Sequence, residues 1–421
     1  MSFGAEIRVP GDKSITHRAL MLAALARGSS RLTGLLTSLD ARSSARVLRQ
    51  LGAGITPLRD GAAVTVTGRP QFGEPAGTLD CGNAGTTARL LTGLLAAQRL
   101  SARLSGDASL RRRPMRRVTE PLSAMGARFA PAAADRLPFR ITGGMLSPLR
   151  YDLPVASAQV KSALLLAGAA GGVEVSLLER GSPSRDHTER LLAALGFPIF
   201  HRDGRVELRG SARFRPFDLA IPGDPSSAAF LLGAILVRGR GALAIPGVCI
   251  NPTRVGFLRV LERMGAALAR SDETEVMGEP VATVAIRGGA LTAADIAPDE
   301  VPSLVDEVPL LAVLATRARG VTRFRSVGEL RVKESNRLEL LAENLRAAGQ
   351  EAAVEGDDLL VEGGARPPRG RIVTAGDHRI AMAFAVLGLA DGARLRVDNP
   401  SCADVSFPGF AAALRRVAKA A

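Results

Sequence analysis

Residues 9–28 read VPGDKSITHRALMLAALARG, and this order of polar entry, apolar run and glycine turn decides the fold because the chain repeats it. The alanines and leucines of the second half favour a helix, Ser14 or Thr16 can cap its start, and Gly28 ends the run. We therefore expect a buried helix with the Gly-Asp turn at its mouth.

Lys13 and Arg18 stand at the start of this expected helix. The dipole and the unpaired N–H groups of a helix N-terminus attract anions, so cations gain nothing from them. Two interpretations remain open. Either both side chains point into solvent, as isolated basic residues usually do, or they face a bound anion.

The same pattern recurs in stretches that begin near residues 80, 155, 221, 306 and 376, and β-type runs follow most of the helices. Six similar units predict two domains of three, and the phrase PGD shared by the first and fourth units places the boundary near residues 221–224. Helices that are apolar on most sides should be buried, with sheets outside them. If these helices run parallel, their N-termini converge on one face of each domain. Two such faces turned toward each other would attract anions.

The composition predicts a globular, cytoplasmic protein. A chain of 421 residues with 46% hydrophobic residues suggests two domains, and no signal peptide or uncharged apolar stretch of membrane-spanning length is visible. The cysteines are few and widely separated, which predicts neither disulfides nor a metal site. No glycine-rich dinucleotide motif follows a strand, so we expect neither a metal nor a nucleotide cofactor.

A net charge of +14 allows two classes of anionic partner. Nucleic acid fits poorly, because the chain has no tryptophan, one tyrosine (Tyr151) and arginines spread along its whole length. An anionic small molecule would use the charge more locally. Lysine is rare beside arginine, so a retained lysine marks a position where an ammonium is not replaceable; Lys13, Lys161 and Lys333 lie in motif-like stretches, while Lys419 is expected at a solvated helix end.

Eight motifs in family order resemble the 5-enolpyruvylshikimate-3-phosphate (EPSP) synthase family over the whole chain. They are PGDKSITHRAL at 10–20, CGNAGTTARL at 81–90, SLRRRPM at 109–115, SAQVKSALLLAG at 157–168, SRDHTERLL at 184–192, DEVPLLAVLA at 306–315, RVKESNRL at 331–338 and GDHRIAMAF at 376–384. The resemblance implies a two-domain inverse α/β barrel-like fold of six βαβαββ units, three per domain. The implied domains are 13–222, and 1–12 together with 223–421.

The resemblance also implies the chemistry. The 5-hydroxyl of shikimate-3-phosphate attacks C2 of phosphoenolpyruvate, C3 is protonated, and phosphate leaves the tetrahedral intermediate, a step of aromatic amino-acid biosynthesis. The implied partners are these two small molecules, with no nucleic acid, no membrane and a monomeric chain. Two phosphates and two carboxylates require several fixed cations, which favours the bound-anion interpretation of Lys13 and Arg18.

The resemblance assigns site residues position by position. Contacts to shikimate-3-phosphate fall on Lys13, Ser14, Arg18, Ser157, Ala158, Gln159, Arg185, Asp306 and Lys333. Contacts to phosphoenolpyruvate fall on Lys13, Gly85, Arg113, Gln159, Arg337 and Arg379. Proton transfer falls on Asp306 and Glu334 with Lys13 assisting.

Structural interpretations compete with these assignments. Taken alone, Glu334 would more often form an i, i+3 ion pair with Arg337, and Asp306 and Glu307 would be acids favoured by a helix dipole. For Glu334 the motif favours the catalytic role over the ion pair. The choice of Asp306 rests on the resemblance alone. The histidines within motifs, His17, His187 and His378, receive no catalytic role.

Two departures from the family pattern stand out. Asp404 and Val405 occupy the place where many relatives carry a lysine, and Glu329 stands where part of the family has asparagine. Together with the motifs SAQ and RDHTE, they point to a subgroup some of whose members tolerate glyphosate, although tolerant members have alanine at the position of Gly85. The nearest alternative is UDP-N-acetylglucosamine enolpyruvyl transferase, which usually has a reactive cysteine in a mobile loop.

Overall fold

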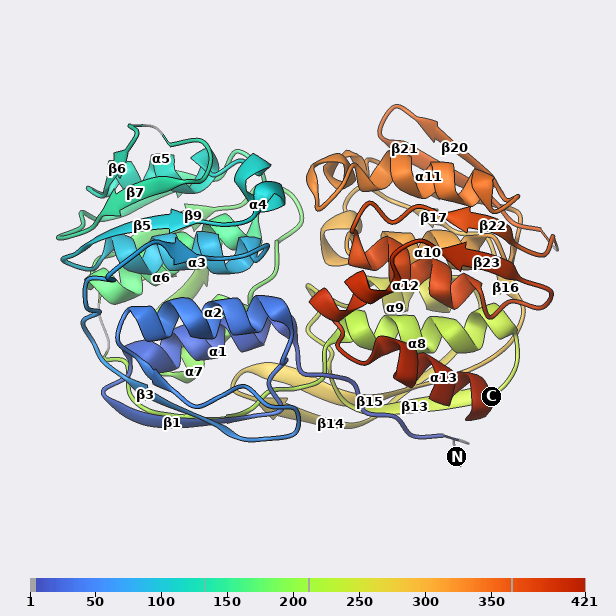
Figure 1. The fold of residues 1–421 in the computed structure, drawn as a ribbon, viewed down its shortest axis with the longest axis horizontal. Coiled ribbons are helices and arrows are strands. Elements are labelled where there is room, and N and C mark those ends of the chain that lie inside the picture. Colours follow the sequence, from blue (N-terminus) through green and yellow to red (C-terminus); the bar gives the residue numbers. More distant parts are fainter. Residues whose placement is uncertain (1–4, 133, 211–212, 365, 421) are drawn as a thin grey trace. The chain divides into compact units, whose positions relative to one another are not determined.

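The computed structural model describes residues 5–132, 134–210, 213–364 and 366–420 (Figure 1). By its contacts the chain divides into two compact units. Unit 1 consists of Met1–Pro10, Pro222–Thr274 and Pro280–Ala421, and unit 2 consists of Gly11–Ile221 and Glu275–Glu279. The domain boundaries expected from the sequence do not include Glu275–Glu279 in the first domain. Those boundaries stay a prediction.

Unit 2 combines helices with four-stranded sheets. Its helices are α1 (Lys13–Leu25), α2 (Leu39–Gln50), α3 (Gly85–Ala96), α4 (Ala108–Arg112), α5 (Arg116–Ala124), α6 (Ala158–Gly171) and α7 (His187–Ala194). Its sheets have the orders β12-β1-β3-β2, β4-β5-β7-β6 and β10-β11-β9-β8. The pairs β1/β12, β4/β5 and β8/β9 are parallel and the other pairs antiparallel. The strands are β1 (Gly28–Thr33), β2 (Gly54–Ile55), β3 (Val64–Gly68), β4 (Leu79–Asp80), β5 (Ser101–Ser105), β6 (Arg128–Ala130), β7 (Phe139–Thr142), β8 (Leu149–Asp152), β9 (Val175–Leu178), β10 (Ile199–Arg202), β11 (Arg205–Leu208) and β12 (Asp218–Ala220).

Unit 1 is built from the same kinds of element. Its helices are α8 (Pro225–Arg238), α9 (Gly256–Arg263), α10 (Val308–Ala315), α11 (Arg337–Ala347), α12 (His378–Leu387) and α13 (Phe410–Ala420), with 3₁₀ turns η1 (Val301–Ser303), η2 (Gly328–Val332) and η3 (Pro400–Val405). Its sheets have the orders β13-β15-β14, β16-β18, β17-β19-β21-β20 and β22-β23. The strands are β13 (Ala242–Cys249), β14 (Ala267–Val276), β15 (Glu279–Arg287), β16 (Leu291–Thr292), β17 (Asp295–Ile296), β18 (Ala318–Arg319), β19 (Val321–Phe324), β20 (Glu351–Glu355), β21 (Asp358–Glu362), β22 (Arg369–Ile372) and β23 (Arg394–Val397).

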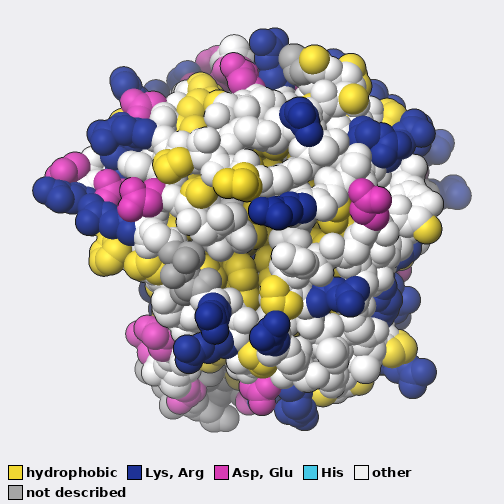
Figure 2. All heavy atoms as spheres, turned by 90° about the vertical axis from the view of Figure 1, so that its left-hand side faces the viewer, with side chains coloured by type: hydrophobic (Ala, Val, Ile, Leu, Met, Phe, Trp, Pro, Cys, Tyr) yellow, Lys and Arg dark blue, Asp and Glu magenta, His cyan; other side chains and the backbone are white. Residues whose placement is uncertain are grey.

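Strands β3 and β21 illustrate how sheets cover the core with one face. Side chains alternate between buried and exposed along β3 and β21, as expected for a strand that covers a core on one side. On the face that Figure 2 shows, Lys and Arg side chains are scattered among apolar and uncharged groups, with no single basic patch. None of the described helices is long and apolar enough to cross a membrane.

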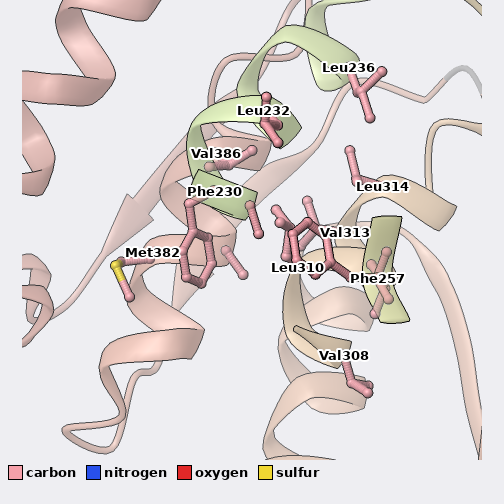
Figure 3. Packing of buried hydrophobic residues seen from close by; sticks show 14 of the residues in the cluster. Phe230, Leu232, Leu236, Phe257, Val308, Leu310, Val313, Leu314, Met382 and Val386 are labelled. Atoms are coloured by element: carbon pink, nitrogen blue, oxygen red, sulfur yellow. The ribbon is translucent and has the colours of Figure 1, made fainter. Parts of the chain in front are cut away.

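The six helices expected from the repeated pattern are confirmed as α1, α3, α6, α8, α10 and α12. All side chains of α8 from Pro225 to Val237 are buried, which is the state that a helix apolar on all sides requires. Phe230 of α8, Leu310 of α10 and Met382 of α12 belong to one hydrophobic cluster (Figure 3). These three helices therefore lie within the core of unit 1.

The cap of α1 corrects one prediction. Asp12, rather than Ser14 or Thr16, caps the helix, and its Oδ1 accepts the N–H of Ile15 at 2.8 Å. The Oγ1 of Thr16 instead accepts the N–H of Leu36 at 3.1 Å. The helix ends at Leu25, and Gly28 begins β1 instead of ending the helix.

The expected convergence of helix N-termini is confirmed within unit 2. Ser44 Oγ lies 2.7 Å from His17 Nδ1 in α1 and 2.7 Å from Thr87 Oγ1 in α3. Gln159, in the first turn of α6, donates to Thr86 Oγ1 in the first turn of α3 at 3.0 Å. The starts of α1, α3 and α6 therefore lie together.

Unit 1 has the same arrangement. Ser226, at the start of α8, donates to Glu307 Oε1, which directly precedes α10, at 2.5 Å. Arg379, in the first turn of α12, donates to the carbonyl oxygen of Asp306 at 2.8 Å. The starts of α8, α10 and α12 therefore meet, which brings unpaired N–H groups of three helices near one another.

Candidate active site

Lys13 is the first residue of α1 and forms an ion pair with Asp40 in the first turn of α2. The Lys13 side chain is 23% exposed and that of Asp40 only 7%, so the ammonium lies at the surface above a buried carboxylate. The sequence did not single out Asp40. The helix dipole disfavours a positive charge at the start of α1. The negative charge of Asp40 compensates the ammonium of Lys13 there.

Arg18 lies deeper than expected. It is 3% exposed and donates to Thr188 Oγ1 at 2.7 Å, Ser162 Oγ at 2.7 Å and the Ser14 carbonyl oxygen at 2.9 Å. Burial lowers the pKa of Arg18 to about 10, against the opposing attraction of Glu189. A guanidinium has five N–H donors, so Arg18 can hold these partners and still bind a carboxylate.

Gly85 opens α3 beside two guanidinium groups. A Cβ at this position would lie 2.8 Å from Arg89 Nη1 and 3.2 Å from Arg113 Nη1. Arg113 donates to Asn83 Oδ1 at 2.7 Å. The glycine thus lets both cations approach the start of the helix.

Arg89 is a site candidate that the sequence reasoning missed. It donates to Gln159 Oε1 at 2.9 Å and to the Pro114 carbonyl oxygen at 3.0 Å, and so connects α3, α6 and the segment after Arg113. Its place inside the motif CGNAGTTARL was the available signal.

Ser157 and Ala158 are partly buried at the N-terminus of α6, and the side chain of Ser157 makes no capping bond. Arg185 lies in the segment between β9 and α7 and is also partly buried. Its positive charge lowers the pKa of Arg18, so the two cations are near each other. Arg185 and Arg18 belong to the same part of unit 2, since Thr188, three residues after Arg185, accepts a hydrogen bond from Arg18 at 2.7 Å.

In unit 1, Asp306 is surrounded by guanidinium groups. Its carboxylate oxygens lie 3.7 Å from Arg254 Nη1, 3.8 Å from Arg337 Nη1 and 3.4 Å from Arg379 Nη2. The side chain of Asp306 is 16% exposed, and that of Arg337 is fully buried. The structure thus brings Asp306, Arg337 and Arg379 together, as assigned.

Arg337 joins two further carboxylates. It donates to Asp377 Oδ2 at 2.9 Å and to Glu334 Oε2 at 2.5 Å. Burial would lower the pKa of Arg337, but Asp377, Glu334 and Asp306 more than offset burial and raise it. The ion pair that competes with a catalytic role for Glu334 is therefore present, and it leaves the Glu334 side chain 27% exposed.

Lys333 and the two departures have local partners. Lys333 forms an ion pair with Glu329, four residues before it, and not with the acids around Arg337. Asp404 accepts the N–H of Gly409 at 3.2 Å and so closes the turn before α13.

Unit 1 also contains site residues that the sequence did not reveal. Asp377 caps α12 and was visible only as part of the motif GDHRIAMAF. Asp224 caps α8 and accepts from Arg254 Nη2 at 3.3 Å, and its signal was the repeated phrase PGD. Arg254 is 3% exposed and had no motif. We call Asp224, Ser226, Arg254, Asp306, Glu307, Glu334, Arg337, Asp377 and Arg379 the unit 1 cluster.

The cysteines Cys81 and Cys249 and the possible metal ligands among the described residues are not arranged as a reactive site. Cys81 and Cys249 are fully buried, and burial raises the pKa of the Cys81 thiol to about 12. Neither is placed as an exposed reactive thiol. Across the described residues, no group of three or more His, Cys, Asp or Glu side chains is placed to hold a metal ion.

Comparisons with known proteins agree with these features. A family model described as EPSP synthase (3-phosphoshikimate 1-carboxyvinyltransferase) matches residues 2–414. The chain is 50% identical over 419 residues to the 3-phosphoshikimate 1-carboxyvinyltransferase of Thermus thermophilus, covering 98% of this chain and 96% of that one. It is 47% identical over 418 residues to that of Granulibacter bethesdensis, covering 96% and 91%.

Solved structures give the same result. An EPSP synthase from Acinetobacter baumannii matches with a TM-score of 0.87 at 37% identity, covering 98% of this chain and 95% of that one. The enolpyruvyl transferase NikO from Streptomyces tendae, at 18% identity and a TM-score of 0.75 over 98% of this chain and 94% of that one, shares the mixed α/β fold alone. By sequence and by fold, the chain belongs to the EPSP synthase family.

Proposed function

We propose that the helix N-termini gathered in each unit bind the substrates and that acids of the unit 1 cluster move the protons. As a member of this family, the chain transfers the enolpyruvyl group of phosphoenolpyruvate to the 5-hydroxyl of shikimate-3-phosphate and releases phosphate. The observation that supports the residue assignment is the convergence of three helix starts in each unit, of which all but the start of α8 carry residues from the motifs.

For shikimate-3-phosphate we propose the following contacts. The carboxylate of the substrate is held by Ser14 and Arg18, and its phosphate by Ser157, Ala158 and Arg185. Helix N–H groups at the start of α6 suit a phosphate, because they carry the positive end of the dipole. Lys13, Gln159, Asp306 and Lys333 complete the proposed set.

For phosphoenolpyruvate we propose a set dominated by guanidinium groups. The planar fork of arginine matches the geometry of carboxylate and phosphate, and Arg113, Arg337 and Arg379 supply it. Gly85 leaves space beside Arg113, because any side chain there would meet that guanidinium. Lys13 and Gln159 contact this substrate as well.

For proton transfer we propose Asp306 and Glu334, assisted by Lys13. One acid accepts the proton of the 5-hydroxyl as its oxygen bonds to C2, and a proton is delivered to C3. The proton is then removed from C3 as the C–O bond to phosphate breaks, which restores the enol double bond. Contact with three guanidinium groups keeps Asp306 oriented, and partial exposure leaves Glu334 accessible to a substrate.

The finer architecture belongs to the same proposal. We infer six βαβαββ units, three per domain, in domains 13–222 and 1–12 plus 223–421. Three described stretches support this count, because β4 to β7, β8 to β11 and β17 to β21 each contain one four-stranded sheet with helices after its first two strands. We further propose a monomeric, cytoplasmic enzyme with no nucleic-acid partner.

The test is phosphate release from phosphoenolpyruvate with each acceptor in turn. We expect release with shikimate-3-phosphate and none above background with UDP-N-acetylglucosamine. Activity only with the sugar nucleotide would overturn the assignment. Tight, salt-sensitive DNA or RNA binding that phosphoenolpyruvate does not compete with would restore the nucleic-acid alternative.

A further inference from the structure

Lys161 is a buried cation that the proposed mechanism does not use. It lies one turn into α6, is 1% exposed, and its Nζ lies 2.7 Å from Glu179 Oε2, 2.9 Å from Glu189 Oε1 and 3.1 Å from the Ser184 carbonyl oxygen. Three oxygens around one ammonium match its three N–H donors. Burial would lower the pKa of Lys161, but Glu189 and Glu179 more than offset it and raise the pKa, so the ammonium stays charged.

The partners of Lys161 bracket the segment that carries Arg185. Glu179 directly follows β9, and Glu189 lies in the first turn of α7. Glu179 also accepts the Oγ–H of Ser184 at 2.5 Å and the N–H of Ser184 at 3.2 Å. The chain is therefore held at both ends of the segment and at the residue directly before Arg185.

A second network holds the other side of Arg185. Thr188 Oγ1 donates to Ser162 Oγ at 2.7 Å, and Arg18 donates to both hydroxyls. Ser162 follows Lys161 in α6, so adjacent residues of one helix hold both networks. Arg185 lies between the anchored Ser184 and the anchored Thr188.

We propose that Lys161, Glu179 and Glu189 form a positioning cluster that fixes the backbone around Arg185 so that its guanidinium meets the phosphate of shikimate-3-phosphate. The inference rests on the phosphate role proposed above for Arg185. Lys161 acts through Arg185 and does not itself touch the substrate. The same helix begins with Ser157 and Ala158, so the cluster also sets the distance between Arg185 and the start of α6.

The cluster explains why this position holds one of the few lysines. A guanidinium is planar and larger than an ammonium, and it cannot place three donors around a single point. Lys161 is 1% exposed and its three oxygen partners surround the ammonium, so a larger group would have to displace them. Lys161→Arg therefore keeps the charge but shifts Glu179, Ser184 or Glu189, and with them Arg185.

The experiment is a double-mutant cycle on steady-state kinetics with Lys161→Arg and Arg185→Ala. Each single variant should raise KM for shikimate-3-phosphate about tenfold or more, since a displaced contact to a charged group costs at least this much. KM for phosphoenolpyruvate should change less than about twofold. In the Arg185→Ala background, Lys161→Arg should add no further increase, because interacting residues are not additive.

Arg205→Lys is the matched control. Arg205 is another mostly buried cation of unit 2, 14% exposed and 2.6 Å from Asp152, outside the Arg185 segment. This swap should leave both KM values unchanged.

Each outcome separates the proposals. If Arg185→Ala leaves KM for shikimate-3-phosphate unchanged, the phosphate role of Arg185 fails. If only Arg185→Ala has an effect, or if the two increases multiply fully, the positioning role of Lys161 is wrong. Should Lys161→Arg not fold, Ser184→Ala removes one anchor without burying a charge, and it should raise the same KM by about threefold through the same cycle.

Discussion

The two units gather helix N-termini in the same way but surround them with different chemistry. In unit 2, Arg89 and Arg113 donate to amide and carbonyl oxygens. In unit 1, Arg337 and Arg379 contact the carboxylates of Asp306 and Asp377 among others. One geometry thus supports two kinds of site.

The difference teaches how each unit contributes. Amide and carbonyl oxygens orient Arg89 and Arg113 in unit 2, and oriented guanidinium groups suit a polyanionic substrate. Carboxylates fix the arginines of unit 1 and add groups that can exchange protons. We therefore propose that unit 2 contributes mainly to binding, whereas unit 1 contributes guanidinium groups for binding and the carboxylates for proton transfer.

The largest expected effect is that of Glu334→Gln on turnover. Glutamine keeps the size and an oxygen for Arg337 but cannot transfer a proton. We expect kcat to fall by about 10² to 10⁴, the usual contribution of a general acid or base. Near-normal turnover would remove Glu334 from catalysis and leave only its ion pair.

Next comes Arg337→Lys in the unit 1 cluster. Lysine cannot reproduce the fork that joins Asp377 and Glu334, so kcat/KM for phosphoenolpyruvate should fall about a hundredfold. The control Arg323→Lys alters a partly exposed ion pair with Asp358 in the same unit and should leave kcat/KM for phosphoenolpyruvate unchanged. Equal effects of the two variants would contradict the role of Arg337.

Gly85→Ala tests the space beside the unit 2 arginines. We expect the unmodified enzyme to be sensitive to glyphosate, despite its subgroup features. The added methyl meets Arg89 and Arg113, and overpacking of about 1 to 3 kcal/mol corresponds to a roughly ten- to hundredfold higher inhibition constant. KM for phosphoenolpyruvate should rise less, because glyphosate is slightly longer.

The control for this variant is Gly144→Ala, since a Cβ on Gly144 meets nothing within 4 Å. Inhibition is measured for all three proteins at matched phosphoenolpyruvate saturation. Equal inhibition constants for the unmodified enzyme and Gly85→Ala would show that Gly85 is not the determinant.

The smallest expected effect is on the pH dependence of stability. It comes from His17, whose ring contacts the Ser44 hydroxyl near the helix starts of unit 2. Burial lowers the pKa of His17 to about 3, so the folded chain keeps this ring neutral. Below pH 6.5 the His17 ring binds a proton in the unfolded chain but stays neutral in the folded chain. The free energy of unfolding therefore falls as the pH falls from 6.5 towards 3. The loss at pH 5 is about 2 kcal/mol.

Urea unfolding at pH 7 and pH 5 checks this expectation. His17→Asn should lose about 2 kcal/mol less than the unmodified chain over this interval. His201→Asn, at an exposed histidine of the same unit, should follow the unmodified chain. Equal pH dependence in all three proteins would show that His17 titrates normally.

The central helices could be predicted because each carries its own signal, a polar entry followed by a run that is apolar on all sides. The cap of α1 could not, because Asp12, Ser14 and Thr16 are all good caps and only the position of Leu36 decides where Thr16 bonds. The local sequence pattern therefore predicts that a helix is present better than it predicts the residue at which the helix begins.

The site was predictable where motifs carry it and not where distant segments meet. Arg337 and Asp377 lie 40 residues apart, and no local pattern indicates that they form an ion pair. Arg254 comes from a loop without a motif, and Asp40 from an ordinary helix start. These contacts depend on how the helices pack.

The division of roles between the units is tested most directly by the dissociation constant of shikimate-3-phosphate, measured by calorimetry for Arg185→Ala and Glu334→Gln. We predict that Arg185→Ala weakens binding about tenfold or more, because it removes a charge-assisted contact, while Glu334→Gln stays within about twofold of the unmodified enzyme. Weakened binding in Glu334→Gln together with unchanged binding in Arg185→Ala would contradict the account.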